Sequence, residues 1–291
     1  MNLTRALARR LVFDHPRVMW ALTRITTRGG EADVQLCGAP LRIDRREERS
    51  LWRSHRILDQ TYVGRMAEAV ATVALIVGPG DTFVDVGANV GLHASGVSRL
   101  SYLFPAMRSY AIEPHPGAVR RLRESVSGRN VEVLEVAVSD RSGTVEFAEG
   151  VSTLTFTPRG GSDDFTLHGT SRMVETRRLD ELDLVGDSLV LKLSVRGFER
   201  QALDGASGLI EAGRIKALFT HHELDEQELP DQLTAQGFAL FDSTTLQPGV
   251  TQNLLAVHRR WLDSWHPPAH ARVSEPLRRA NAGGGPLIKA E

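Results

Sequence analysis

The chain has 291 residues, of which 41% are hydrophobic and 24% are charged, and its formal net charge is -1. This composition is typical of a folded globular protein with one large domain or two small ones, and it excludes wholesale disorder. A charge so close to zero gives no overall attraction to nucleic acid or to an anionic membrane, so either partner would need a local patch, and we expect no nucleic-acid partner. The single cysteine, Cys37, excludes disulfides within the chain and is expected to be a small buried residue.

The N-terminal region mixes arginines with apolar residues. Met1 to Arg10 lacks the apolar core and cleavage site of a secretory signal, and no stretch is long and apolar enough for a transmembrane segment, so we expect a cytoplasmic protein. Residues 3–25 have the pattern of an amphipathic helix. Two interpretations stay open: a helix packed on its own domain, which is the commoner case, or a helix on a membrane surface.

A hairpin is predicted for residues 33–44, where apolar and polar residues alternate around Gly38-Ala-Pro40. A charged stretch and a helix over residues 67–76 follow it. The sequence Gly78-Pro-Gly-Asp81 is a strong breaker of regular structure. We therefore treat residues 1–79 as an N-terminal part made of a helix, a hairpin and a lead-in helix.

From residue 80 onward, short apolar stretches alternate with amphipathic ones. We expect strands at 83–86, 110–112, 131–136, 189–193, 215–219, 238–241 and 253–257. We expect helices at 90–100, 116–126, 198–211 and 227–236. Such alternation predicts right-handed crossovers and an α/β fold of the Rossmann-like kind, with a mainly parallel, doubly wound sheet and helices on both faces.

Two segments depart from this alternation. Residues 143–177 are rich in threonine, serine and glycine, and we expect an antiparallel hairpin or a flexible insertion there. Beyond Arg260, prolines and the sequence Gly283-Gly-Gly-Pro286 are typical of a flexible tail. The chain is thus divided into residues 1–79, a Rossmann-like domain over 80–258, and a tail over 259–291.

The first predicted strand of the domain ends at Asp85 and is followed by Gly87, Gly91 and a helix. Glycines there let the backbone turn sharply and let a ligand approach it. The spacing Gly-Ala-Asn-Val-Gly lacks the third glycine of the dinucleotide motif, which disfavours an oxidoreductase that uses a dinucleotide. S-adenosylmethionine, which has no phosphate to bind, suits this turn better.

The second strand ends at Glu113, about twenty residues past the glycine turn, where an acidic side chain can accept hydrogen bonds from both hydroxyls of a ribose. Asp85 can hydrogen-bond the loop or face the ammonium group of the cofactor. The alternative is that Asp85 caps a helix and Glu113 lies at a solvated strand end. Their combination within one strand-helix-strand unit favours a cofactor site.

The sequence from Val84 to Gly91 resembles the opening motif of the FkbM family of methyltransferases. Further similarities lie, in family order, at Ala111 to Pro116, Val133 to Asp140, Arg178 to Leu182 and Asn253 to Val257. The resemblance covers residues 80–258 and implies a class I methyltransferase fold that binds S-adenosylmethionine and methylates hydroxyl oxygens on sugars, polyketides and similar natural products. It thereby implies a small-molecule or glycan acceptor. The cofactor-binding residues that it implies are Asp85, Gly87, Asn89, Gly91, Glu113, Ala137 and Val138.

The fourth strand departs from the family pattern. It reads Lys192-Leu-Ser-Val-Arg-Gly-Phe-Glu199, with Ser194 where the family has aspartate and Arg196 where it has glutamate. The carboxyl ends of central strands line the ligand crevice, so the exchange removes a possible base or ammonium partner. Two functions are compatible with this pattern: an O-methyltransferase, or a cofactor-binding protein with lost or altered catalysis.

Methyl transfer to a hydroxyl needs alignment and usually a base, because an alcohol is a poor nucleophile at neutral pH. The candidate catalytic residues are Lys192, Ser194, His221 and His222, with His93 as a further candidate base. Histidine titrates in the useful range, although a histidine at a strand end is often only solvated. A metal site at His221, His222 and Glu223 is disfavoured because adjacent strand residues point to opposite faces, so no metal is expected.

The other charged and aromatic clusters have plainer interpretations. Arg120, Arg121 and Arg123 are expected to form a solvated helix face. Trp52, Trp261 and Trp265 are expected to pack rather than bind a ligand. The pattern leaves the oligomeric state open, and we expect the acceptor pocket to be built from the N-terminal helix and residues 143–177.

Overall fold

The structure is a computed structural model that describes residues 29–36, 38–48, 51–52, 70–148, 157–158, 171–195, 197–221 and 227–264. The predicted N-terminal helix, most of the tail, and the individual residues Cys37, Arg196, His222 and Trp265 lie outside these ranges. Of the predicted lead-in helix, residues 70–76 are described and are helical.

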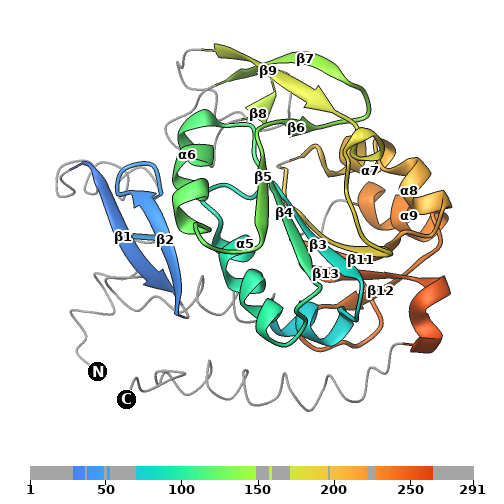
Figure 1. Cartoon of the computed structure of the whole chain (residues 1–291). Coiled ribbons are helices and arrows are strands. Elements are labelled where there is room, and N and C mark those ends of the chain that lie inside the picture. Colours follow the sequence, from blue (N-terminus) through green and yellow to red (C-terminus); the bar gives the residue numbers. More distant parts are fainter. Residues whose placement is uncertain are drawn as a thin grey trace, which may run out of the picture.

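A seven-stranded sheet forms the centre of the molecule, with the order β12-β13-β11-β10-β3-β4-β5 (Figure 1). Its strands are β3 (Asp81–Val86), β4 (Arg108–Ile112), β5 (Val131–Leu134), β10 (Ser188–Leu193), β11 (Ile215–His221), β12 (Phe238–Asp242) and β13 (Asn253–His258). Neighbouring strands are parallel from β5 to β11, while β13 runs antiparallel to both β11 and β12. The prediction of a mainly parallel, Rossmann-like sheet is confirmed.

Helices cover both faces of this sheet, because successive strand residues point to opposite sides. Val84 and Val86 belong to one core, together with residues of α7 (Glu199–Asp204), α8 (Ser207–Glu211) and α9 (Glu228–Ala235). Phe83 belongs to the opposite core, with residues of α5 (Leu92–Val97) and the 3-10 helix η1 (Ser98–Tyr102). The helix α6 (Pro116–Ser125) also packs on this second face, through Leu122 against Ala111 of β4. The doubly wound arrangement therefore follows from the strand pattern.

Two predicted helices are each divided in the structure. The stretch 90–100 starts only at Leu92, since Gly91 adopts a left-handed conformation with φ 92°, and it tightens into η1 at Ser98. The stretch 198–211 is interrupted after α7. At this break a Cβ on Gly205 would lie 2.0 Å from the carbonyl oxygen of Ser139, so the close approach of these two chain segments requires a glycine there.

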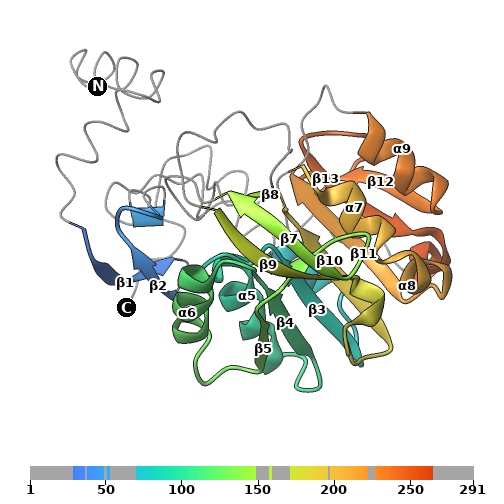
Figure 2. The ribbon, with the colours of Figure 1, turned by 90° about the horizontal axis from the view of Figure 1, so that it is seen from above.

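A smaller sheet with the order β6-β9-β7-β8 lies above the central sheet (Figures 1 and 2). It contains β6 (Ala137–Val138), β7 (Gly143–Ala148), β8 (Thr157–Pro158) and β9 (Ser171–Arg177). β7 pairs antiparallel with Ser171–Thr176 of β9, so the described part of residues 143–177 follows the antiparallel alternative of the two that the sequence left open. This sheet closes one side of the site described below.

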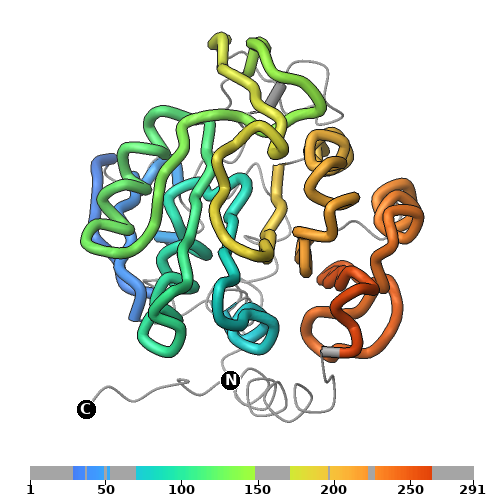
Figure 3. Tube along the Cα trace, turned by 45° about the vertical axis from the view of Figure 1, so that its right-hand side comes forward, coloured from blue at the N-terminus to red at the C-terminus, as the bar shows by residue number. Residues whose placement is uncertain are grey.

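The N-terminal hairpin, β1 (Glu31–Leu36) and β2 (Ala39–Asp44), lies beside α6 (Figure 3). Arg121 of α6 donates a hydrogen bond of 2.8 Å to Glu48, which follows the hairpin, and is only 3% exposed. The expectation that Arg121 is solvated is therefore wrong. Arg120 and Arg123, whose side chains are 51% and 55% exposed, do lie on the solvated face.

In the described ranges, no helix has the length and apolar character needed to span a bilayer.

Candidate active site

The turn after β3 depends on three residues with positive φ: Gly87 (76°), Asn89 (51°) and Gly91 (92°). A Cβ on Gly87 would lie 2.0 Å from the carbonyl oxygen of Ser194, at the end of β10. Any side chain at this position would push β3 and β10 apart. The glycine that the sequence singled out is thus required by both the backbone conformation and the close approach of a neighbouring strand.

A buried ion pair supports this turn from beneath. Asp85 is fully buried, its carboxylate accepts a 3.0 Å hydrogen bond from the backbone N–H of Ala94 in α5, and it lies 2.9 Å from the ammonium of Lys192. Lys192 also donates a 2.8 Å hydrogen bond to the carbonyl oxygen of Gly87. The pair therefore ties β10, the glycine turn and the start of α5 together.

Glu113, at the end of β4, has a carboxylate that is 6% exposed and is held by two backbone N–H groups. Asn89 donates to one oxygen at 2.8 Å, and His115 donates to the other at 3.0 Å. Burial raises the pKa of Glu113 to about 7, against the opposing effects of these hydrogen bonds and of Lys192. Each carboxylate oxygen has a lone pair left, so the group can also accept hydrogen bonds from a ligand.

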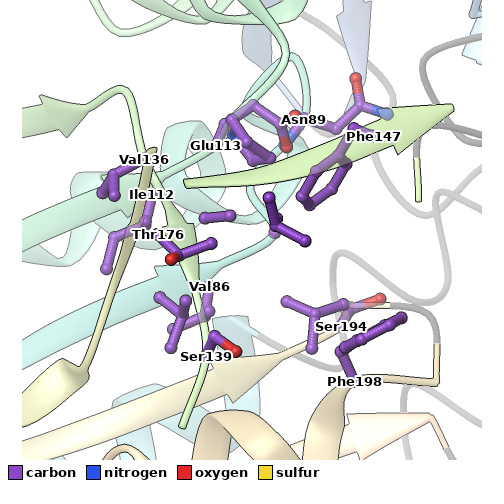
Figure 4. Close-up of a pocket in the computed structure, with 16 residues that line it drawn as sticks. Val86, Asn89, Ile112, Glu113, Val136, Ser139, Phe147, Thr176, Ser194 and Phe198 are labelled. Atoms are coloured by element: carbon purple, nitrogen blue, oxygen red, sulfur yellow. The ribbon is translucent and has the colours of Figure 1, made fainter. Parts of the chain in front are cut away.

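A cavity of about 160 Å³ lies at the carboxyl ends of β3 and β4, beneath the small sheet. Side chains from both sheets converge on it (Figure 4). Its lining is Val86, Gly87, Asn89, Ile112, Glu113, Pro114, Val136, Ala137, Val138, Ser139, Val145, Phe147, Thr176, Ser194, Val195 and Phe198. We call it the first cavity. Its apolar walls and the carboxylate at one end suit a nucleoside, whose base is flat and whose ribose carries two hydroxyls.

Of the residues predicted to bind a cofactor, five line the first cavity: Gly87, Asn89, Glu113, Ala137 and Val138. Asp85 and Gly91 do not line it; they shape the turn from behind, Asp85 through its carboxylate and Gly91 as the N-cap of α5. The lining also includes Phe147 and Thr176 of the small sheet, which the sequence placed on the acceptor side. Only the alternating pattern of β7 marks Phe147 as inward-facing, and that pattern does not show which cavity it faces.

A second cavity of about 120 Å³ lies on the other side of the end of β10. Its lining is Thr72, His93, Lys192, Leu193, Ser194, Phe219, Thr220, His221, Ser243 and Asn253. Three of the predicted catalytic residues, Lys192, Ser194 and His221, line it together with His93. Among the described residues, Ser194 is the one that lines both cavities.

The loop after β10 is held by Glu199, the first residue of α7. Its carboxylate accepts hydrogen bonds from the backbone N–H groups of Val195 (2.9 Å) and Gly197 (2.7 Å). Glu199 therefore shapes this loop, while Ser194 stays exposed at the junction of the two cavities.

The strand order, the glycine turn without a phosphate-binding third glycine, and the buried acid at the end of β4 define the class I, Rossmann-like fold of S-adenosylmethionine-dependent methyltransferases. Residues 85–242 match the family described as the methyltransferase FkbM domain. This match covers more than half of the chain. The chain belongs to the FkbM family and is a methyltransferase of the S-adenosylmethionine-dependent kind, as the sequence resemblance implied.

Solved methyltransferase structures share a general likeness with this chain. A precorrin-6Y C5,15-methyltransferase from Geobacter metallireducens is 17% identical, with a TM-score of 0.37, and the match covers 66% of this chain and 87% of that one. A TehB-like S-adenosylmethionine-dependent methyltransferase from Corynebacterium glutamicum is 13% identical, with a TM-score of 0.39, covering 72% and 93%. No curated protein sequence matches the chain.

Proposed function

We propose that the chain transfers a methyl group from S-adenosylmethionine to a hydroxyl oxygen of a sugar or a similar hydroxylated metabolite. The observation that carries the proposal is the buried carboxylate of Glu113 at one end of the first cavity, held in place by the glycine turn. A carboxylate so placed can accept hydrogen bonds from the two ribose hydroxyls of the cofactor.

The other residues of the first cavity fit the rest of a nucleoside. Ile112, Val138 and Phe147 offer apolar surface to the adenine, and the backbone at Gly87 leaves room for close approach. The bound cofactor supplies a methyl group activated by its positively charged sulfur. The chain's own contribution is to orient that group towards Ser194, where the two cavities meet.

A second candidate function is a cofactor-binding protein with lost or altered catalysis. Its support is the serine at position 194, where the family pattern has aspartate. Among the described residues that line the two cavities, Glu113 is the only one with a carboxylate. Since Glu113 belongs to the cofactor side, the described part of the acceptor side contains no carboxylate base. Catalysis then requires a different base or a very reactive acceptor.

Calorimetric titration with S-adenosylhomocysteine tests the cofactor site. We expect the wild-type protein to bind, and Gly87→Ala to lose most of the affinity, because its Cβ would collide with the carbonyl of Ser194. Gly128→Ala is the matched control: Gly128 also has a positive φ (72°), but a Cβ there meets nothing within 4 Å. No binding by well-folded wild-type protein would refute the proposal.

A transfer assay separates the two candidate functions. Labelled S-adenosylmethionine is incubated with the protein and a panel of glycans and hydroxylated metabolites. Methyl transfer to any of these acceptors rules out a protein that has lost catalysis, whereas tight binding of S-adenosylhomocysteine with no transfer favours that candidate.

We further propose a small-molecule or glycan partner rather than nucleic acid, consistent with the net charge of -1. We also propose the cytoplasm as the location of the protein.

A further inference from the structure

We infer that the second cavity binds the methyl acceptor as a neutral hydroxylated ring of single-sugar size, and that His93 is the catalytic residue that takes the hydroxyl proton. The inference rests on the proposed function and deepens it. It assigns the acceptor side of the reaction to residues of the second cavity.

The position of the second cavity supports its assignment to the acceptor. The second cavity lies at the carboxyl ends of β10 and β11, and because β13 runs antiparallel, its first residue Asn253 lies at the same edge. The cavity meets the first cavity at Ser194. Direct transfer requires the acceptor oxygen within about 3–3.5 Å of the methyl carbon, so the acceptor must occupy a space that adjoins the cofactor's.

The lining chemistry indicates the acceptor class. Thr72, Thr220 and Ser243 contribute hydroxyls and Asn253 an amide, while Phe219 adds an aromatic surface. The described lining contains no carboxylate, and its one ammonium, on Lys192, is paired with buried Asp85 at 2.9 Å. Short polar groups beside an aromatic ring suit the hydroxyls and C–H face of a neutral sugar better than a charged acceptor.

His93 is better placed than His221 to act as the base. It is the second residue of α5, directly after the glycine turn, and is half-buried. Its ring meets Phe219 edge-on, with the centroids 6.5 Å apart. The next backbone N–H, that of Ala94, is fixed by Asp85. His221, at the end of β11, is exposed and is better suited to contact the acceptor.

The proposed methyl transfer conserves atoms, electrons and charge. The acceptor oxygen forms a bond to the methyl carbon while the carbon–sulfur bond breaks, and that electron pair stays on sulfur, which becomes a neutral thioether. The hydroxyl proton moves to the neutral imidazole of His93 and from there to solvent. In this step His93 takes the role of the carboxylate that Ser194 replaces.

The test uses the full chain, labelled S-adenosylmethionine, and methyl glycosides of neutral hexoses and deoxyhexoses, with hexuronic acids for comparison. We expect transfer to at least one neutral glycoside. His93→Asn should lower kcat by about 10²-fold or more, with KM and the affinity for S-adenosylhomocysteine nearly unchanged. Added imidazole should partly restore the rate of His93→Ala. His258→Asn, outside both cavities, is the matched control and should keep the wild-type rate.

The possible outcomes separate a failure of the cofactor site from a failure of the acceptor site. If S-adenosylhomocysteine does not bind, the proposed function fails and this inference fails with it. If it binds but no neutral glycoside is methylated, or only hexuronic acids are, the assigned acceptor class is wrong while the cofactor site stands. If His93→Asn keeps the wild-type kcat, His93 is not the base. The same holds if His93→Ala folds and binds S-adenosylhomocysteine but added imidazole does not restore its rate.

Discussion

At the scale of single residues, Glu113 shows that a buried carboxylate suited to binding a ligand can lower the stability of the folded chain. Its carboxylate lies in a cavity with apolar walls, and burial raises its pKa to about 7 from the usual 4.5. An ionised group in such a place costs free energy in the free protein, because water solvates a carboxylate better. In the proposed function, the two ribose hydroxyls of the cofactor would compensate for the lost water.

The raised pKa of Glu113 predicts a pH-dependent stability. Between about pH 4.5 and 7 the unfolded chain has lost this proton while the folded chain still holds it, so the free energy of unfolding falls as pH rises, by up to about 3 kcal/mol. Glu113→Gln should remove this contribution. In urea titrations, the variant's stability relative to wild type should therefore increase between about pH 5 and pH 8.

The matched control for this experiment is Glu132→Gln, which makes the same exchange at an exposed position on β5. Its difference from wild type should stay the same across that range. If Glu113→Gln behaves like this control, the carboxylate of Glu113 is not held in the buried state described above.

At the scale of elements, α6 joins the N-terminal hairpin to the Rossmann-like domain. The backbone N–H of Arg42 in β2 donates to the hydroxyl of Ser125 at 2.8 Å, and Arg121 reaches Glu48 at 2.8 Å. Apolar residues of the hairpin also pack on Val90 and Leu92, which border the glycine turn. The hairpin is thus packed against the very segment that shapes the first cavity.

Replacing the arginines of α6 measures this junction. Arg121→Ala should lower the free energy of unfolding by about 3 kcal/mol or more, since Glu48, only 1% exposed, would keep a buried charge without its guanidinium partner. Arg123→Ala, on the solvated face of the same helix, should cost less than about 1 kcal/mol. Chemical denaturation of both variants is the measurement, and equal costs would show that the hairpin contact contributes no stability.

At the scale of the whole molecule, residues of the central sheet and of the small sheet together line the first cavity. Phe147, 5% exposed, reaches the first cavity from β7, while the β3 and β4 ends form the opposite wall. A ligand held between them stabilises the folded state in proportion to its affinity. Binding in the first cavity should therefore be visible as a gain in the stability of the entire domain.

S-adenosylhomocysteine at about 100 times its Kd should raise the free energy of unfolding by about 2.7 kcal/mol. At the same ligand concentration, Phe147→Ala should reduce this gain by about 1 kcal/mol or more, because it removes apolar contact with the ligand. Met173→Ala, on β9 but 62% exposed, should leave the gain unchanged. Ligand-dependent denaturation of the three proteins is the measurement; an equal gain in all three would place the ligand away from Phe147.

The features that the sequence by itself determined are those set by local backbone and periodicity. Gly87 and Gly91 could be assigned to a sharp turn after the first strand of the domain, because glycine readily adopts the positive φ that the turn needs. The alternation of strands and helices predicted the mainly parallel sheet. The place of Glu113 at the end of a strand predicted a position at the crevice, and Glu113 lines the first cavity there. Each of these depends on a few neighbouring residues.

Only the tertiary structure decided the features that depend on distant partners. Arg121 and Arg123 look alike in the sequence, and they differ because Glu48 lies against only one of them. Lys192 was a candidate catalytic residue, and its position beside Asp85 and Gly87 supports a positioning role. The second cavity combines residues from Thr72 to Asn253, so no local pattern could predict it. Sequence spacing fixes which way a chain turns, but contacts between remote segments fix which charges are buried and which side chains meet.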